Sequence, residues 1–409
     1  MLPNPIPEKY RSDRLFLLIG ENPLPNYVSA LLLVDTGKKS TIYLLHSDGA
    51  DNTPSTKPYA ELLLRSLRLK LPNAVFRLYE LNESDSTKIA ASMKTILERE
   101  KISGTVGLNY TGGTKPMSHH SYLALRERFP NAVFSYLDAN QLALRIDGET
   151  TCYPVAQAVE VSLEELAQLH GYELKNIRTT PRQEKLAQAL AQVHATDKGF
   201  EEWRKWCNRL GEPMPTLPNV KEFPNLKPVV DVFDEICGGA NETTPEKVAT
   251  ALGFPELKNA AKWFIGGWLE DCALAAIMVN IPRFNILYYG IGLNPKPHIV
   301  PPGVKINFDL DVATMIGYQL FAISCNVSEP GKGERGVVKD HLLEVFVRAR
   351  QLGGDEARAA LVCTSKSPQS LQAELERGWN AWGRIRVFGR YDLPDLANAF
   401  RIWFAQSTK

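Results

Sequence analysis

Residues 106–117 read V-G-L-N-Y-T-G-G-T-K-P-M, and this stretch decides how the first half of the chain folds. The apolar, β-branched composition of residues 102–108 predicts a strand, and the composition of 118–128 predicts a helix. Residues 109–116 therefore form a loop between a strand end and a helix start. Its paired glycines allow positive φ and close approach of the backbone, and its lysine precedes a proline that can open a helix.

Such a loop can serve as an anion site. Backbone N–H groups, hydroxyls and one cation at the start of a helix suit a phosphate group. The plain alternative is a tight turn that needs two glycines, because the loop matches neither the P-loop nor the G-x-G-x-x-G pattern. The candidate ligand contacts are Asn109, Thr111, Gly112, Gly113, Thr114 and Lys115.

Strand and helix patterns alternate around this loop. Alternation of this kind predicts a parallel sheet with right-handed crossovers, that is, a Rossmann-like domain of about 150 residues. The predicted strands are 14–20, 40–47, 74–81, 102–108 and 132–138, and the predicted helices are 59–71, 85–101 and 118–128. Ligands of such sheets bind outside the carboxyl ends of the strands. The loop 20–26 then shares an edge with 109–116, which adds Asn22 and Asn26 as candidates, although each is more often a turn residue.

Length and composition set limits on the whole chain. With 409 residues it is long enough for two or three domains. It has 47 basic and 46 acidic residues, so bulk charge does not require a nucleic-acid partner, although a local groove can still be basic. The six cysteines are scattered without a C-x-x-C pair, as expected in a reducing compartment. Without a signal peptide or a run of 18 apolar residues, we expect a cytoplasmic protein with no membrane partner.

Composition changes after about residue 174. Residues 180–211 have helical composition, and 212–228 contain five prolines, which suits a connector of polyproline II character. We therefore divide the chain into a Rossmann-like domain at 1–174, a helical and proline-rich connector at 175–228, and a second α/β domain at 229–409.

Carboxylates gather in the predicted elements of this last part. A mostly apolar helix at 260–279 contains Glu270 and Asp271, and acidic side chains there are costly unless they are paired or face an active site. Asp309 and Asp311 lie two apart in a predicted strand at 304–314, so they point to the same face. Gly317 then turns the chain into a second strand at 319–325. A helix at 337–352 and strands at 359–365 and 384–388 complete the domain.

The first domain resembles the CARF (CRISPR-associated Rossmann fold) sensors, in the subgroup fused to a restriction-endonuclease-like domain. The resemblance is carried by N-Y-T-G-G-T-K-P-M and by V-S-L-E-E-L-A-Q-L-H-G-Y at 161–172. It implies a homodimer that binds a cyclic oligoadenylate, commonly cyclic tetra-adenylate, across its two-fold axis. Residues 111–115 would then face the phosphates and riboses of the ring.

The order of elements in the second domain resembles the PD-(D/E)XK nucleases. That resemblance implies Mg²⁺ or Mn²⁺ held by Asp311, Glu270 and Asp309, and cleavage of single-stranded RNA, DNA or both. Members commonly end the second strand in I-(E/S)-C-K, whereas this chain has I-S-C-N, with Ser324 and Asn326. Asparagine cannot supply the positive charge of the usual lysine.

Three outcomes follow from this departure. Lys339 or Lys332 can reach the same point in space from another part of the chain, or Asn326 can orient a water molecule by hydrogen bonding alone. In the third outcome the domain is a degenerate nuclease, and the protein is a non-enzymatic cyclic-oligoadenylate sensor that acts on a partner.

Overall fold

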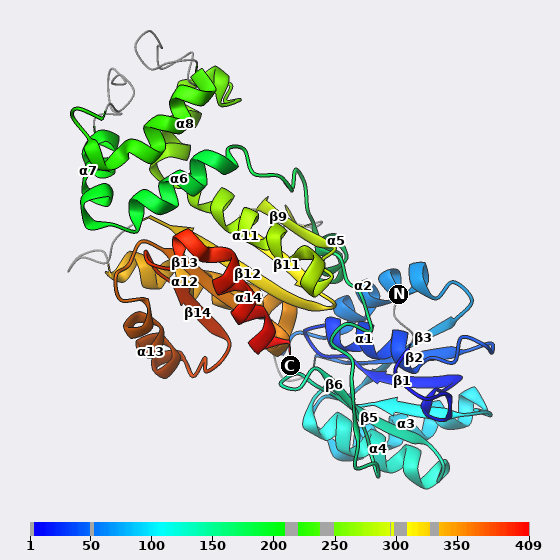
Figure 1. Ribbon diagram of the computed structural model, residues 1–409. Helices are drawn as coiled ribbons and strands as arrows, with labels where there is room; N and C mark the ends of the chain where they lie inside the picture. Colours follow the sequence, from blue (N-terminus) through cyan, green and yellow to red (C-terminus); the bar gives the residue numbers. More distant parts are fainter. Residues whose placement is uncertain are drawn as a thin grey trace.

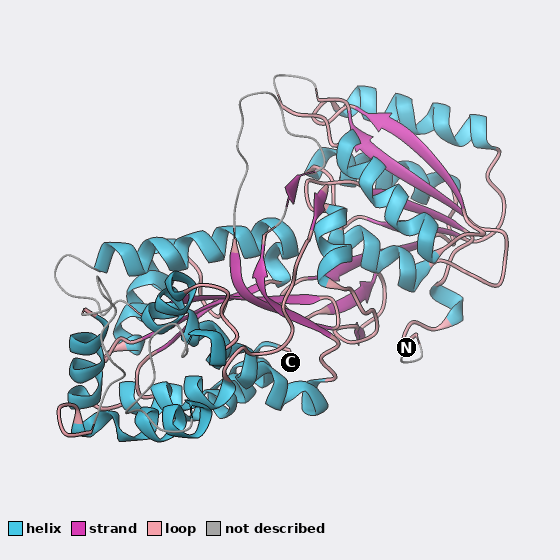
Figure 2. Ribbon diagram, turned by 90° about the horizontal axis from the view of Figure 1, so that it is seen from above, coloured by secondary structure: helices cyan, strands magenta, loops and turns pink. Residues whose placement is uncertain are grey.

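The protein consists of two α/β domains that lie side by side (Figure 1; Figure 2). The computed structural model describes residues 4–49, 53–208, 220–237, 249–294, 296–297, 309–327 and 335–408. The blue-to-cyan part of the chain forms the first domain, and the green-to-red part forms the second.

The first domain contains a seven-stranded sheet in the order β3-β2-β1-β4-β5-β6-β7. Its strands are β1 (Arg14–Leu18), β2 (Thr41–Ser47), β3 (Val75–Leu81), β4 (Val106–Asn109), β5 (Val133–Asp138), β6 (Ala143–Ile146) and β7 (Cys152–Pro154). The first five are parallel, and β6 and β7 are antiparallel additions at one edge. The predicted Rossmann-like sheet is therefore confirmed, while the two antiparallel strands were not predicted.

Helices cover both faces of this sheet. Buried residues of α1 (Leu24–Leu33), α2 (Lys57–Lys70) and α5 (Leu163–Leu169) pack in one apolar cluster. Those of α3 (Ser86–Glu100) and α4 (Lys115–Arg128) pack in another. A sheet buried on both faces explains why its central strands are nearly continuous apolar runs.

The second domain contains a five-stranded sheet in the order β14-β13-β12-β11-β9. Its strands are β9 (Tyr288–Leu293), β11 (Leu310–Ile316), β12 (Gln319–Asn326), β13 (Arg358–Cys363) and β14 (Ile385–Phe388). Gly317, with φ of +61°, turns β11 into β12 as predicted. Strands β12, β13 and β14 are parallel, so they end at the same edge.

Helices also cover both faces of the second sheet. On one face lie α12 (Arg335–Gly353) and α13 (Pro368–Trp379), and on the other lie α11 (Trp268–Phe284) and α14 (Leu396–Ser407). Three more helices, α6 (Glu184–His194), α7 (Asp197–Cys207) and α8 (Lys227–Cys237), form a layer at the end that lies away from the first domain (Figure 1). Trp203, Trp206 and Phe264 form the aromatic centre of this layer.

The proline-rich segment differs from a polyproline II connector where the structure describes it. Pro224–Leu226 form a 3₁₀ turn that leads into α8, and Phe223 and Leu226 are buried in the aromatic layer. Residues 209–219 lie outside the described part of the chain. The connector bounds of 175–228 remain a prediction.

Several contacts join the two domains, including a strand ladder, a backbone hydrogen bond and a shared apolar cluster. Tyr172–Glu173 pair with Lys296–Pro297 as a short antiparallel ladder. At the β11–β12 turn, the N–H of Val161 donates to the carbonyl oxygen of Gly317 at 3.2 Å. One apolar cluster contains residues of both domains, so the core is continuous across the boundary.

One helix, Lys258–Phe284, is long and apolar enough by composition to cross a membrane, but 61% of its most apolar window is buried inside the protein. It is the central helix of the second domain, which accounts for its composition.

The five described cysteines outside α8 are free thiols.

Two predicted strand starts differ from the structure. The first, β4, begins at Val106 rather than at 102, because Gly104 has φ of +101° and turns the preceding residues away from the sheet. The second, β11, begins at Leu310, and residues 304–308 of the predicted strand lie outside the described part of the chain. Asp309 therefore stands just before the strand rather than within it.

Candidate functional sites

The loop between β4 and α4 lies at the switch point of the first sheet. Strand β1 pairs with β2 on one side and with β4 on the other, so the loops after β1 and β4 leave the sheet in adjacent positions. This is the place where open α/β sheets bind ligands. The shared edge predicted for 20–26 and 109–116 is confirmed.

Both glycines of the loop are required by its geometry. A Cβ at Gly112 would lie 2.2 Å from the carbonyl oxygen of Leu18, so only glycine lets the loop pass this close to β1. Gly113 has φ of +73°, a conformation that disfavours side chains. Thr114 then caps α4 by accepting a hydrogen bond from the N–H of Met117 at 3.3 Å, and a proline lies in the first turn.

The polar side chains of the loop divide into two groups. Asn109 is fully buried, donates to Ser135 at 3.1 Å and accepts from the N–H of Thr111, so it supports the loop from beneath. The hydroxyl of Thr111 accepts from the N–H of Leu137 at 2.8 Å. Lys115 is exposed at the start of α4, and no interaction of its side chain is found within the described residues. It is the cation of the loop that faces solvent.

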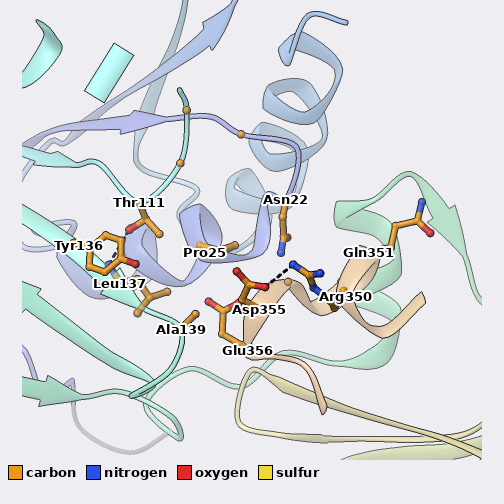
Figure 3. A pocket seen from close by; sticks show the side chains of 14 residues that line it. Asn22, Pro25, Thr111, Tyr136, Leu137, Ala139, Arg350, Gln351, Asp355 and Glu356 are labelled. Atoms are coloured by element: carbon orange, nitrogen blue, oxygen red, sulfur yellow. Dashed lines mark hydrogen bonds and ion pairs between the residues drawn. The ribbon is translucent and has the colours of Figure 1, made fainter. Parts of the chain in front are cut away.

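A pocket of about 530 Å³ opens above this loop, between the two domains (Figure 3). Its first wall comes from the first domain, and its second wall comes from the end of α12 and the turn η5 (Gly354–Glu356). The first wall is lined by Gly20, Asn22, Pro25, Thr111, Gly112, Gly113, Tyr136, Leu137 and Ala139, and the second by Arg350, Gln351, Gly354, Asp355 and Glu356.

The second wall is rich in charge. Arg350 Nη2 lies 2.8 Å from Asp355 Oδ1, and Arg384 Nη1 lies 3.0 Å from the same oxygen. Glu356 is only 2% exposed, and burial raises its pKa to about 7. The pocket therefore combines the glycine loop of the first domain with a wall that carries two ion pairs and one buried carboxyl group of raised pKa.

Asn22 and Asn26 have different roles at the first wall. Asn22 accepts a hydrogen bond from the N–H of Leu24 at 3.0 Å, and its side chain faces Gly354 across the pocket. A Cβ at Gly354 would lie 2.3 Å from Asn22 Nδ2, so a glycine permits this approach. Asn26 is buried and donates to the carbonyl oxygen of Leu18 at 3.0 Å, so it is a structural residue.

A second candidate site lies at the edge of the second sheet where β11 begins and β12 ends. We call this site, with Asp311 and Glu270, the carboxylate edge. Asp311 Oδ2 accepts from the hydroxyl of Ser324 at 2.9 Å and from the N–H of Cys325 at 2.7 Å. Glu270 reaches the same region from α11. Burial raises the pKa of Glu270 to about 7, and the negative charges of Asp311 and Asp271 add to this effect.

The other two carboxylates singled out in the sequence are placed differently. Asp271 is fully buried and accepts hydrogen bonds from the N–H of Arg182 and from Trp263 Nε1, and Arg178 Nη1 lies 2.7 Å from it. It anchors the start of the helical layer to α11. Asp309 is exposed and accepts a hydrogen bond from Asn294 Nδ2.

The residues at this edge offer some, but not all, of the ligands that a divalent cation needs. Burial raises the pKa of Asp311 as well as that of Glu270. The ionised form of each carboxyl group therefore costs free energy in the folded protein. A cation between the two carboxylates would reduce that cost. In the described part of the chain, however, no three side chains of His, Cys, Asp or Glu are grouped as a ready metal site. The Asp311–Glu270 pair can supply two ligands, and the third predicted ligand, Asp309, stays a prediction.

The substitutes for the missing lysine are placed as follows. Lys339 forms an ion pair with Glu374 of α13, so its charge is engaged by that carboxylate. Lys332 lies outside the described residues. Asn326 ends β12 beside Cys363 of β13. His341 of α12 lies close enough to Asp311 to lower the pKa of that carboxyl group, and the sequence patterns did not single it out.

No protein-family model matches the sequence, and no curated protein matches it. Two solved structures share its fold over nearly the whole chain. Protein VC1899 from Vibrio cholerae has a TM-score of 0.72 at 16% identity, over 97% of this chain and 99% of that one. Can2 from Sulfobacillus thermosulfidooxidans, in complex with cyclic tetra-adenylate, has a TM-score of 0.67 at 15% identity, over 96% of each chain. The chain therefore has the two-domain fold of these proteins.

Proposed function

We propose that this protein is a CARF-domain effector of type III CRISPR defence, in which a cyclic oligoadenylate activates metal-dependent cleavage of single-stranded RNA or DNA. The observation that carries the proposal is the glycine loop at the switch point, which opens into a pocket shared with the second domain. The fold of Can2, whose structure contains cyclic tetra-adenylate, supports this ligand.

The loop offers what a phosphate-bearing ring needs. Gly112 and Gly113 let the loop pack closely against β1 while it lines the pocket, and Lys115 adds a cation at the start of α4. The aromatic ring of Tyr136 lines the same pocket, where it can stack on a base.

A ring with two-fold symmetry calls for a symmetric dimer. The face formed by α3 and α4 adjoins the ligand loop, because α4 begins there, and it contains a groove of about 900 Å³. Leu123 of α4 is 47% exposed in this groove, among apolar neighbours that include Leu97 and Phe129. A second copy of the chain seated on this face would place two α4 helices, each of which begins at a loop 109–116, next to each other. Replacing Leu123 with aspartate should then give a monomer in light scattering, whereas Lys38→Ala should not.

Helix α12 offers a physical connection between the two sites. Its end lines the ligand pocket, and its first half packs at the carboxylate edge, near Asp311. With 19 residues it spans about 28 Å. A ligand that moves the second wall would therefore displace the helix that carries His341 and Lys339.

At the carboxylate edge, Asp311 and Glu270 would hold the cation. A bound Mg²⁺ or Mn²⁺ would supply a nucleophilic hydroxide and neutralise charge on the phosphate. The chain's own part is to keep Asp311 oriented through Ser324 and the N–H of Cys325, and to exclude water around the buried Glu270.

One observation favours a second candidate, a non-enzymatic sensor. Asn326 stands where a lysine is usual, and Lys339 is paired with Glu374. A cleavage assay with labelled single-stranded RNA and DNA, Mn²⁺ and cyclic tetra-adenylate separates the two candidates. Cleavage that requires the ring and disappears in Asp311→Ala supports the nuclease. Ring binding without cleavage under any of these conditions supports the sensor.

A further inference from the structure

His170 joins the two domains at the end of the motif V-S-L-E-E-L-A-Q-L-H-G-Y, which the function proposed above does not use. Its Nε2 donates to the carbonyl oxygen of Leu352 at 2.7 Å, across 182 residues of sequence. Burial lowers the pKa of His170 to about 4, so the imidazole is neutral at pH 7 and carries its proton on Nε2. Leu352 lies in the last turn of α12, where carbonyl groups lack partners within the helix. His170 therefore caps α12 from the first domain.

The first domain holds His170 in a fixed place. Helix α5, which ends at His170, begins with a capping box formed by Ser162 and Glu165. Lys70 of α2 lies 2.5 Å from Glu165, and the buried residues of α5 belong to the continuous core. After His170, Gly171 with φ of +76° turns the chain into the short ladder that also joins the domains. The imidazole therefore stands on a well-anchored part of the first domain.

The end of α12 is in contact with the first domain and with the ligand pocket at neighbouring points. Arg350 and Gln351, in the same turn as Leu352, line the pocket opposite the glycine loop (Figure 3). Two residues after Leu352, Gly354 lies so close to Asn22 that a Cβ there would be 2.3 Å from Asn22 Nδ2. The point at which the first domain holds the helix is therefore next to the point at which a bound ligand would push it.

This arrangement gives α12 the geometry of a lever. At 1.5 Å per residue, Arg350 lies about 3 Å along the axis from Leu352, and His341 lies about 17 Å from it. A rotation about the held end therefore moves His341 roughly five times as far as Arg350. Because helix shifts of about 1–2 Å are typical of switching proteins, a shift of about 0.3 Å at the pocket is sufficient. His341 is the residue of α12 whose charge acts on Asp311.

We propose that His170 is a positioning residue that serves as the pivot of α12, so that a cyclic oligoadenylate bound in the pocket turns the helix and moves His341 relative to Asp311. Without this hydrogen bond, a push on the second wall would shift the end of the helix at Gly353 and Gly354 instead of turning the helix. The inference rests on the proposed function, because it names how ligand binding reaches the carboxylate edge.

The test measures backbone hydrogen exchange of residues 338–345 in the full chain, without ligand and with cyclic tetra-adenylate at a concentration that calorimetry shows to be saturating for each protein. His170→Phe keeps an aromatic ring but removes the donor. His170→Gln keeps an N–H group that can donate to the same carbonyl oxygen. Ile177→Val is the control, because it removes one methyl group from the same domain boundary, where Ile177 lies against Gly290 of β9.

Cyclic tetra-adenylate should change the exchange of 338–345 in the wild type, in His170→Gln and in the control. The change should be lost in His170→Phe, although this variant still binds the ligand and is therefore folded. If the wild type cleaves nucleic acid, the stimulation of its rate by cyclic tetra-adenylate should fall about 5-fold or more in His170→Phe, the lower end of allosteric coupling.

The pivot would be overturned by a His170→Phe protein that responds as the wild type does, or by a His170→Gln protein that has lost the response. A wild type that binds cyclic tetra-adenylate without any change at 338–345 would overturn it as well. These results differ from failure of the proposed nuclease. A wild type that never cleaves, but whose exchange responds only while residue 170 can donate, would refute the nuclease and keep the pivot. Full ligand-dependent cleavage by His170→Phe would keep the nuclease and refute the pivot.

Discussion

Replacing the buried carboxylic acid of Glu356 with the amide of glutamine should change how the stability of the protein depends on pH. Burial raises the pKa of Glu356 to about 7, with Asp355 adding to the effect and Arg358 and Arg384 opposing it. An acid whose pKa is higher in the folded state than in the unfolded chain binds its proton more tightly when folded. The stability that it contributes is present below pH 4.5 and is lost as the pH rises through 7.

The size of the effect follows from the two pKa values. One pKa unit corresponds to about 1.4 kcal/mol, so the rise from 4.5 to about 7 makes the ionised side chain cost roughly 3 kcal/mol. Most of this cost, roughly 2–3 kcal/mol, appears between pH 5 and pH 8. Glu270 titrates in the same range, but it is present in both proteins and cancels in the difference.

Urea unfolding at pH 5, 6, 7 and 8, followed by tryptophan fluorescence, gives the free energy of unfolding of each protein. We expect Glu356→Gln to be close to the wild type at pH 5 and more stable by roughly 2–3 kcal/mol at pH 8. The exposed Glu61 on α2 supplies the matched control, Glu61→Gln, which makes the same chemical change at the surface instead of in the core. Parallel curves for wild type and Glu356→Gln would refute the assigned pKa and the reasoning from burial.

The ligand loop and the carboxylate edge give further predictions. Lys115→Ala should weaken binding of cyclic tetra-adenylate by roughly 1–3 kcal/mol in calorimetry if it forms a charge-assisted phosphate contact, and unchanged affinity would remove it from the site. Gly112→Ala should lower the melting temperature and abolish ring binding, because its Cβ would lie 2.2 Å from the carbonyl oxygen of Leu18; wild-type binding would contradict the close approach. Asp311→Ala should abolish any cleavage, measured on labelled strands, since a lost carboxylate leaves the ion misplaced. If the wild type is inactive, Asn326→Lys should restore cutting, and an inactive Asn326→Lys would show that more than the lysine has been lost.

The local sequence was sufficient to predict the conformation of the loop 109–116. The conformation of 109–116 depends on neighbours in the chain: Gly113 supplies the positive φ and Thr114 the helix cap. The second wall of the pocket could not be predicted in this way. Arg350 and Glu356 are more than 230 residues away in sequence from that loop, and no local pattern brings them to it.

At the carboxylate edge, too, local sequence predicts the elements but not the contacts between them. The spacing of Asp309 and Asp311 predicts a common face, and the turn at Gly317 predicts the hairpin. Sequence alone does not distinguish Glu270 from its neighbour Asp271, because that distinction depends on packing. Asp271 is held by Arg178, while Glu270 is left beside Asp311.

The continuous core limits how the two domains can be exchanged between related genes. Leu15 and Leu17 of β1 belong to the same apolar cluster as Leu320 of β12 and Leu352 of α12. A cut near residue 174 would therefore expose apolar surface on both fragments, so the two domains should melt as one cooperative unit. Recombination that exchanges one domain for a relative's must also replace the matching surface of the other. The two domains of this architecture are expected to evolve as a pair rather than as interchangeable modules.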